Sequence, residues 1–299
     1  MRVIVSAILA AIVLSMPVSL GAWGMEVHRL ITKRAIENLP AEIRPFYLQR
    51  IEFIAEHSVD PDLWRVVGLR GAMGDEDPNH FLDMDAIDQR PFANIPRDYS
   101  AYVAKVGAEN AAKWGRLPWR TEEVYTKLVE EFKKIAAGQA YAGDNVRYLS
   151  AVLAHYVEDA HQPFHAVVNY DGQATNQRGI HSRFETTLPM RHLSAITWAP
   201  VVITPIADVK TFAFDALIRS ESLVDRILVA DRAAAEGREF YDDAFFAAFF
   251  KGARPILEQR LNDSVNGVAS VFVAAWTAAG KPALARDGAA RPPARIIRR

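Results

Sequence analysis

The amino-acid sequence predicts an all-α fold, and two observations lead to this prediction. Apolar residues recur at intervals of three and four along the chain, as they do on the buried face of a helix. Strand-like stretches are scarce, and beyond Glu185 residues 201–203 are the most that could qualify. The sequence also contains no internal repeat, P-loop or dinucleotide-binding fingerprint.

The N-terminal third of the chain alternates helical and irregular segments. A first helix is expected over residues 26–39, where Pro40 ends a helical apolar period, and a second over residues 41–56. Asp62 follows a proline and should lie near the start of a new turn. Residues 66–97 are rich in Gly, Pro and Asp, so we expect them to be irregular.

The rest of the chain is expected to be mostly helical. Thr121 can cap a helix whose first turn is acidic, and the helix with His155 should begin near Asn145. Pro163 should break or kink that helix. Further helices are expected over residues 208–228, 231–251 and 257–276.

Composition limits how such a fold can be stabilised. The chain has 299 residues, half of them hydrophobic, which is enough for one large core or two small ones. Cysteine is absent, so the fold must be held by its core or by metal rather than by disulfides. The net charge of −1 argues against nonspecific coating of nucleic acid.

Both ends of the chain differ in composition from the middle. Residues 1–22 contain one basic residue, an apolar run and small residues before position 23, which predicts a signal peptide and a secreted or periplasmic protein. The apolar run is too short for a comfortable membrane span. Cleavage after Ala22 would expose Trp23, and cleavage one residue away is an alternative. Residues 281–299 form a basic, Pro- and Ala-rich tail that we expect to be disordered.

Residues 155–185 contain four of the eight histidines. His155 and Asp159 are four residues apart, as are His181 and Glu185, and on a helix that spacing places both side chains of a pair on one face. Imidazole nitrogen and carboxylate oxygen together suit Zn²⁺. One such pair is most simply a surface ion pair, but two pairs around a His-Gln-Pro-Phe-His turn favour a metal centre.

Five segments of the chain resemble the zinc-dependent phospholipase C / P1 nuclease superfamily. The resemblance spans residues 23–280 and implies a multi-helix catalytic domain of the phospholipase C/P1 nuclease type with a trinuclear zinc site. The matching motifs are Trp23-x4-His28, Asp62-x-x-Arg65, the His80-Phe81 element, His155-x3-Asp159 with His165, and His181-x3-Glu185.

The resemblance also implies which residues bind each of three Zn²⁺ ions. The first ion would take Asp62, His80, His155 and Asp159. The second would take His165, His181 and Glu185. The third would take Trp23, through its α-amino nitrogen and carbonyl oxygen, together with His28 and a shared Asp159.

The activity implied is that of a secreted phosphodiesterase that hydrolyses its substrate with a zinc-activated water. Asp62 would orient or deprotonate the water and Arg65 would meet the phosphate. The spacing from His165 to His181 resembles the phospholipase C branch, which favours a phospholipid head group as substrate. The spacings Trp23-x4-His28 and Asp62-x-x-Arg65 instead resemble the nucleases, so an S1/P1-type nuclease acting on single-stranded nucleic acid stays an alternative. A second alternative is a catalytically dead zinc-binding protein, and no stable protein partner is inferred.

Several residues near these motifs receive simpler interpretations. His57, His161 and His192 are expected not to bind metal, with His161 behind the ligands or on the surface. Phe81, Tyr170 and Phe184 could contact a base or acyl-glycerol. The remaining acidic residues of this region are expected to be surface charges, namely Asp75, Glu76, Asp83 and Asp85.

Overall fold

The structure is a computed structural model that describes residues 24–66, 75–139 and 141–285. Helices dominate these residues, and no β-strand occurs among them beyond an isolated bridge between Leu82 and Gly115. The all-α prediction is therefore confirmed. The helical segments are α1 (Met25–Glu37), α2 (Arg44–Leu48), α3 (Ile51–His57), α4 (Asp60–Val66), η1 (Asp77–Asn79), α5 (Met84–Ile87), α6 (Tyr99–Val106), α7 (Ala108–Trp114), α8 (Leu117–Ala136), α9 (Ala142–Ala160), η2 (Pro163–Ala166), α10 (Ile180–Ser182), η3 (Arg183–Thr187), α11 (Leu188–Arg191), η4 (Leu193–Ala195), α12 (Val209–Glu221), α13 (Val224–Ala235) and α14 (Asp243–Ala278).

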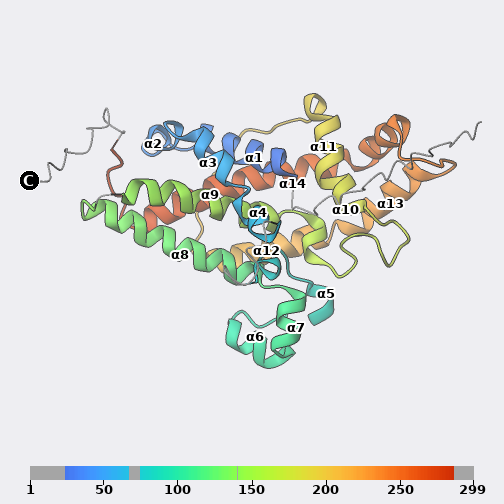
Figure 1. Ribbon diagram of the computed structural model, residues 1–299, viewed down its shortest axis with the longest axis horizontal. Coiled ribbons are helices and arrows are strands. Elements are labelled where there is room, and N and C mark those ends of the chain that lie inside the picture. The colour runs from blue at the N-terminus through green and yellow to red at the C-terminus, as the bar shows by residue number, and fades with distance from the viewer. Residues whose placement is uncertain (1–23, 67–74, 140, 286–299) are drawn as a thin grey trace, which may run out of the picture.

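Helix α9 lies at the centre of the molecule. Its residues 150–160 are all buried, and it packs against α8, α14, α3, α12, α1 and α4. Figure 1 shows α8 and α9 side by side, with the long helix α14 running in a similar direction. The buried apolar side chains of these helices form one contiguous cluster. The polar groups of residues 150–160 are therefore held inside a rigid, water-poor scaffold.

Helix α14 is longer than its sequence predicts. Two helices were expected over residues 231–251 and 257–276, but one helix runs without interruption from Asp243 to Ala278. Pro255 removes one backbone hydrogen bond, yet it is exposed, and so is Lys251, whose carbonyl loses its donor and can be solvated. Ala253 and Ile256 on either side of the proline are buried. Burial of that face keeps the helix continuous.

Three other boundaries also differ from expectation. The helix expected over residues 41–56 is divided into α2 and α3. The predicted break between residues 228 and 231 is absent, because α13 spans it. Thr121 is not a cap: α8 begins four residues earlier, next to Pro118, and the buried Thr121 hydroxyl donates to the carbonyl of Leu117 at 2.9 Å. Proline is favoured in a first helical turn, which explains the earlier start.

The predictions about the chain ends lie mostly outside the described residues. The expected signal peptide and Trp23 fall there entirely, as does most of the expected basic tail. Residues 281–285 are described and are not helical. Within the described ranges, no helix combines the length and the apolar character that crossing a membrane requires.

Candidate metal centre

Buried His, Asp and Glu side chains form three groups that could each hold a metal ion. Within each group the potential ligand atoms lie within 4.8 Å of one another. His155 belongs to two of the groups, so these two form one continuous cluster around α9. All the metal ligands that the sequence predicts within the described residues belong to these groups. The groups are His28–Asp62–His155, His80–His155–Asp159 and His165–His181–Glu185.

Helix α9 supplies the centre of the cluster. Asp159 lies about one helical turn after His155, and His155 Nε2 is 3.2 Å from Asp159 Oδ2. His80, which follows η1, brings its Nδ1 to 3.0 Å from both of these atoms. The expected spacing on one helix face is therefore confirmed, and a histidine distant in sequence completes the group.

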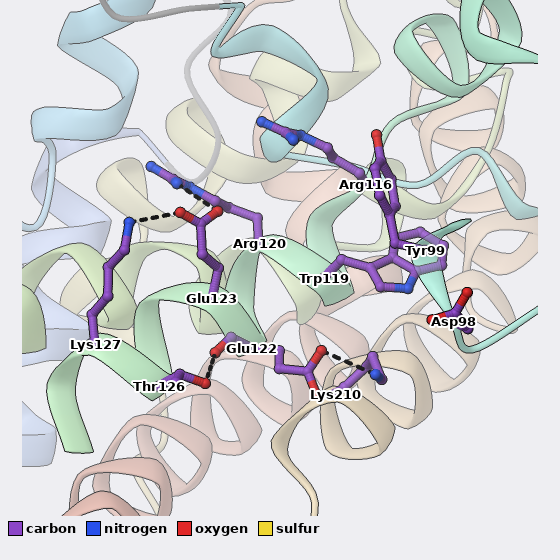
Figure 2. Close-up of a pocket in the computed structure, with 10 residues that line it drawn as sticks. All are labelled: Asp98, Tyr99, Arg116, Trp119, Arg120, Glu122, Glu123, Thr126, Lys127 and Lys210. Carbon is purple, nitrogen blue, oxygen red and sulfur yellow. Dashed lines mark hydrogen bonds and ion pairs between the residues drawn. The ribbon is translucent and has the colours of Figure 1, made fainter. Parts of the chain in front are cut away.

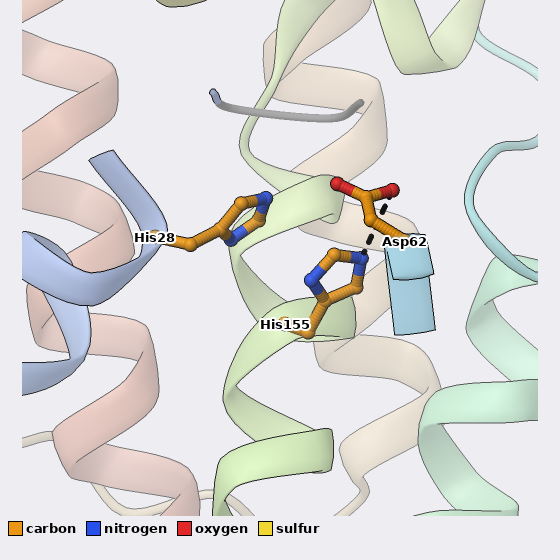
Figure 3. A group of neighbouring side chains, drawn as sticks. All are labelled: His28, Asp62 and His155. Carbon is orange, nitrogen blue, oxygen red and sulfur yellow. Dashed lines mark ion pairs between the residues drawn. The ribbon is translucent and has the colours of Figure 1, made fainter. Parts of the chain in front are cut away.

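Figure 3 shows how His28 and Asp62 approach His155 from two other helices. Asp62 lies in the first turn of α4, with Oδ1 3.8 Å from His155 Nε2. His28 on α1 stacks its ring on that of His155 at a centroid distance of 4.3 Å. Its Nε2 lies 3.8 Å from Asp159 Oδ1, so His28 and Asp159 are near enough to share a cation. Trp23, the expected partner of His28, lies outside the described residues.

The third group begins in the η2 turn, which contains His165. His165 Nε2 is 3.2 Å from His181 Nε2, which in turn is 2.9 Å from Glu185 Oε2. His181 and Glu185 do not share one regular α-helix, because η3 is a π-helical turn that contains Glu185. Such turns are frequent at functional sites. The four-residue spacing still brings the two ligand atoms together.

Neighbouring side chains and carbonyls orient most of these ligands. His155 Nδ1 lies 2.8 Å from the carbonyl oxygen of Ser58, so it donates there and leaves Nε2 facing the cluster. The carboxylate of Glu158 accepts from His28 Nδ1. Gln162 Nε2 donates to Glu185 at 3.1 Å. Sequence reasoning missed Glu158, although an acid beside Asp159 on so apolar a helix was a usable signal.

Glu76 is a further acidic neighbour of His80, too far from it for a hydrogen bond. Its Oε1 lies 3.7 Å from His80 Nε2 and accepts from the Tyr156 hydroxyl. Glu76 is 5% exposed and Asp83 is 9% exposed, so the prediction that both are surface charges was wrong. Asp75 and Asp85 are exposed, as expected. Glu76 and Asp83 lie on either side of η1, which packs against α7 and α8 instead of extending into solvent.

Burial dominates the electrostatics of the cluster. It raises the pKa of the Asp62 carboxyl and raises that of Asp159 well above its usual value. Burial also lowers the pKa of His155 to about 3, and lowers those of His80 and His165 well below the usual range. Without a cation, burial therefore disfavours the charged forms of these acids and of these imidazoles.

His181 and His28 are the exceptions among these imidazoles. Burial lowers the pKa of His181, but Glu185 outweighs burial and raises it. The larger exception is His28. Burial by itself lowers its pKa, but the neighbouring carboxylates of Glu158, Asp159 and Asp62 outweigh burial and raise the pKa to about 9. Burial raises the pKa of Glu158 to about 7. The cluster thus attracts positive charge at the position of His28, and either a proton or a metal ion can supply it.

Unsatisfied atoms give an independent test of whether a metal ion fits. Buried polar atoms are nearly always hydrogen-bonded, so a concentration of unpaired ones calls for an explanation. Divalent cations in the cluster would satisfy His28 Nε2, Asp62 Oδ2 and Asp159 Oδ1, and these residues fit such ions. His80, His165 and His181 face their groups through the ring nitrogen that is not unpaired. The cluster atoms without a hydrogen-bond partner in the described part of the chain are His28 Nε2, Asp62 Oδ2, His80 Nε2, Asp159 Oδ1, His165 Nδ1 and His181 Nδ1.

A cavity of about 480 Å³ opens beside the third group. His165 and His181 line it together with Arg65, whose Nη1 donates to Asp62 at 3.3 Å. Arg65 Nε also donates to Asp77 at 2.9 Å. The cavity therefore joins two candidate ligands to a guanidinium that already contacts the buried cluster. Its other lining residues are Asp77, His80, Phe81, Asp83, Lys113, Phe164, Val168, Tyr170 and Gln173.

Three histidines lie apart from the groups, as the sequence predicts. His57 Nδ1 pairs with Asp60 at 2.8 Å, and His192 stacks on Phe250. His161 is buried and bonds to the carbonyl of Val157, so it is neither on the surface nor behind a ligand.

Phe81 and Tyr170 line the cavity, but Phe184 does not. Its ring is buried against Phe164 and Phe249 in the core.

A second cavity, also about 480 Å³, lies along α8 (Figure 2). Its walls contain many charges, and most of these pair with one another. Arg120 donates to Glu123 at 2.9 Å, and Lys210 donates to Glu122 at 3.0 Å. Arg120 Nε also donates to the Tyr156 hydroxyl at 3.2 Å. No member of the three groups lines this cavity, so we assign it no metal or ligand.

Comparison with known proteins adds no assignment. A scan against protein-family models found no match to this chain, and a search of curated proteins found none.

Proposed function

We propose that this protein is a zinc-dependent phosphodiesterase, a hydrolase that cleaves a phosphodiester bond with water. The observation that most supports the proposal is the shared position of His165, His181 and Arg65 on one cavity wall. Candidate metal ligands and a side chain suited to binding phosphate therefore face the same space. A purely structural zinc site is normally closed by protein ligands and needs no such space.

The proposed ligand sets are those that the family resemblance implies. The short distances between ligand atoms within each group support the first and second sets. The approach of His28 Nε2 to Asp159 supports the third, whose remaining proposed ligand is Trp23. The sets are Asp62, His80, His155 and Asp159 for one ion, His165, His181 and Glu185 for another, and Trp23, His28 and Asp159 for a third.

The residues around the cavity suggest a division of roles. Bound zinc would lower the pKa of water and polarise the phosphoryl oxygens. Arg65 would hold the phosphate with its planar, multiply donating guanidinium. Asp62 would orient the attacking water and accept its proton through Oδ2, the oxygen without a partner in the described residues. As the water oxygen bonds to phosphorus, the bond to the leaving oxygen breaks and that oxygen gains a proton from solvent.

We propose a phospholipid head group as the first candidate substrate. The phospholipase-like spacing of His165 and His181 favours this class. Val168 and Tyr170 line the cavity and are each 44% exposed, which gives its edge an apolar surface that acyl-glycerol could contact.

Phe81 and Asp83 favour a second candidate, cleavage of single-stranded nucleic acid. Both residues line the cavity. An aromatic ring can stack on a base, and a carboxylate can accept from the amino group on the edge of that base. The two candidates share the same phosphodiester chemistry and differ in what the cavity holds beside the phosphate.

Parallel assays of zinc-loaded protein on phosphatidylcholine vesicles and on a single-stranded oligonucleotide test the proposal. We expect hydrolysis of at least one substrate and its loss in Asp62→Asn. Asp60→Asn is the matched control, since Asp60 belongs to the same helical turn but pairs with His57 and Tyr148 instead. Failure to cleave either substrate, with the zinc content verified, would favour an inert zinc-binding protein.

A further inference from the structure

Glu158 is a fully buried acid that belongs to none of the three groups. It lies on α9 directly before Asp159, and its carboxylate reaches across to α1. One oxygen, Oε2, accepts from His28 Nδ1. The other, Oε1, accepts from the Thr32 hydroxyl at 2.8 Å. His28 and Thr32 are four residues apart on α1 and so share one face of that helix.

These contacts determine which nitrogen of His28 faces the cluster. A carboxylate only accepts hydrogen bonds, so His28 Nδ1 must hold the hydrogen that the two share. In the neutral ring the lone pair is then on Nε2. Nε2 has no hydrogen-bond partner among the described residues and lies 3.8 Å from Asp159 Oδ1.

The support given to His28 differs from that given to the adjacent His155. Nδ1 of His155 donates to a neutral backbone carbonyl, whereas Nδ1 of His28 donates to a carboxylate. A carboxylate partner makes the opposite nitrogen a stronger donor to a metal ion. The Thr32 hydroxyl fixes the carboxylate in turn, so α1 and α9 hold the imidazole between them.

We propose that Glu158 is a positioning residue for a metal ion bound through His28 Nε2, and that Thr32 holds Glu158 in place. The proposal rests on the metal centre of the proposed function but does not depend on its substrate. Removing such an outer partner typically weakens metal binding about 10–100-fold. Glu158→Gln keeps the size and one acceptor oxygen but loses the charge.

A double-mutant cycle on zinc affinity separates positioning from general structural support. Zinc affinity is measured by chelator competition, with metal content per chain, for Glu158→Gln, His28→Ala and the double variant. Glu221→Gln is the matched control, because Glu221 is also a buried glutamate on a helix but pairs with Arg90 outside the cluster. Thr32→Val, alone and with His28→Ala, supplies a second cycle that does not alter the acid.

We expect Glu158→Gln to lose zinc affinity about 10–100-fold in the wild-type background and to lose no more once His28 is alanine. Thr32→Val should lose less zinc affinity, and this loss should also disappear once His28 is alanine. If Glu158→Gln does not fold, the Thr32→Val cycle alone tests the proposal. Unchanged affinity in Glu158→Gln, or an equal loss in both backgrounds, would overturn the proposal. If Glu158 and His28 are coupled in zinc affinity but no phosphodiester is hydrolysed, only the proposed function is refuted. If a phosphodiester is hydrolysed but the two residues are not coupled, only this role of Glu158 is refuted.

Discussion

Arg65 Nη1 lies 3.3 Å from Asp62 Oδ1, and the same guanidinium lines the cavity in front of His165 and His181. Asp62 is 2% exposed, whereas the Arg65 side chain is 22% exposed. The pair therefore connects the buried His–Asp cluster to a space that a substrate can enter. Such a connection is expected of the proposed catalytic site and is not needed by a metal site that only stabilises the core.

Arg65→Lys tests the phosphate-binding role. Lysine keeps the charge but loses the planar donor geometry, so we expect kcat/KM for phosphodiester hydrolysis to fall about 10–100-fold. Steady-state kinetics on a substrate that the wild type cleaves provides the measurement. Arg90→Lys is the control, because Arg90 pairs with Glu221 and does not line the cavity. Equal kinetics for Arg65→Lys and the wild type would exclude Arg65 from phosphate binding.

Asp62→Asn and Asp159→Asn should separate catalysis from metal binding. We expect Asp62→Asn to lower turnover by about 10²–10⁴-fold, as loss of a positioned proton acceptor typically does, while most of the metal stays bound. Asp159 lies close to four candidate ligands, so Asp159→Asn should lose metal as well as activity. The four are His28, His80, His155 and His165. Metal content and turnover are measured on the same samples. Full turnover by Asp62→Asn at saturating zinc would show that another group accepts the proton.

Removal of metal should destabilise the fold, because the buried carboxylates and unpaired nitrogens of the cluster would lose their partner. Ligand held at about 100 times its dissociation constant contributes about 2.7 kcal/mol, which corresponds to a fall in Tm of roughly 5–10 °C after chelation. Added zinc should restore the Tm. His57→Ala, which removes a histidine outside the groups, should show the same shift as the wild type. An unchanged melting curve after verified metal loss would argue against metal in the cluster.

The sequence correctly predicts which of these side chains meet in pairs, but it predicts their surroundings poorly. His155 and Asp159 meet as helical spacing requires, because α9 is regular through both residues. The same spacing from His181 to Glu185 brings the atoms together through a π-helical turn that the pattern does not reveal. Periodicity states which residues share a face, but it does not state which helix packs against that face.

This limit explains the specific errors. Glu158 was missed because its partners, His28 and Thr32, lie on α1, about 130 residues away in sequence. Glu76 was taken for a surface charge because its partner Tyr156 also comes from a distant helix. The continuity of α14 through Pro255 is likewise decided by tertiary burial, which outweighs the local preference of proline.

Asp83 should make stability depend on pH. Burial, reinforced by Asp85 and opposed by Lys113, raises its pKa to about 7 in the folded protein. Between its unfolded value of about 3.9 and this folded value, the folded state binds more protons than the unfolded state, so stability falls as pH rises. Asp83→Asn removes this titration and should therefore raise the Tm more at about pH 8 than at about pH 5.

Thermal melts of the Asp83→Asn variant in metal-free buffer at both pH values provide the check. Asp85→Asn is the control, since Asp85 is exposed and should change the Tm little directly. A gain in Tm that is larger at the lower pH would contradict the assigned sign of the titration.

The most direct test of the central claim is a zinc titration of metal-stripped protein in which bound zinc per chain and hydrolysis of bis(p-nitrophenyl) phosphate are followed together. We predict that hydrolysis is absent from the stripped protein, rises as zinc occupies the His and Asp groups, and reaches a plateau once they are filled. Zinc binding without hydrolysis of any phosphodiester, or hydrolysis that persists after the metal is removed, would contradict the account.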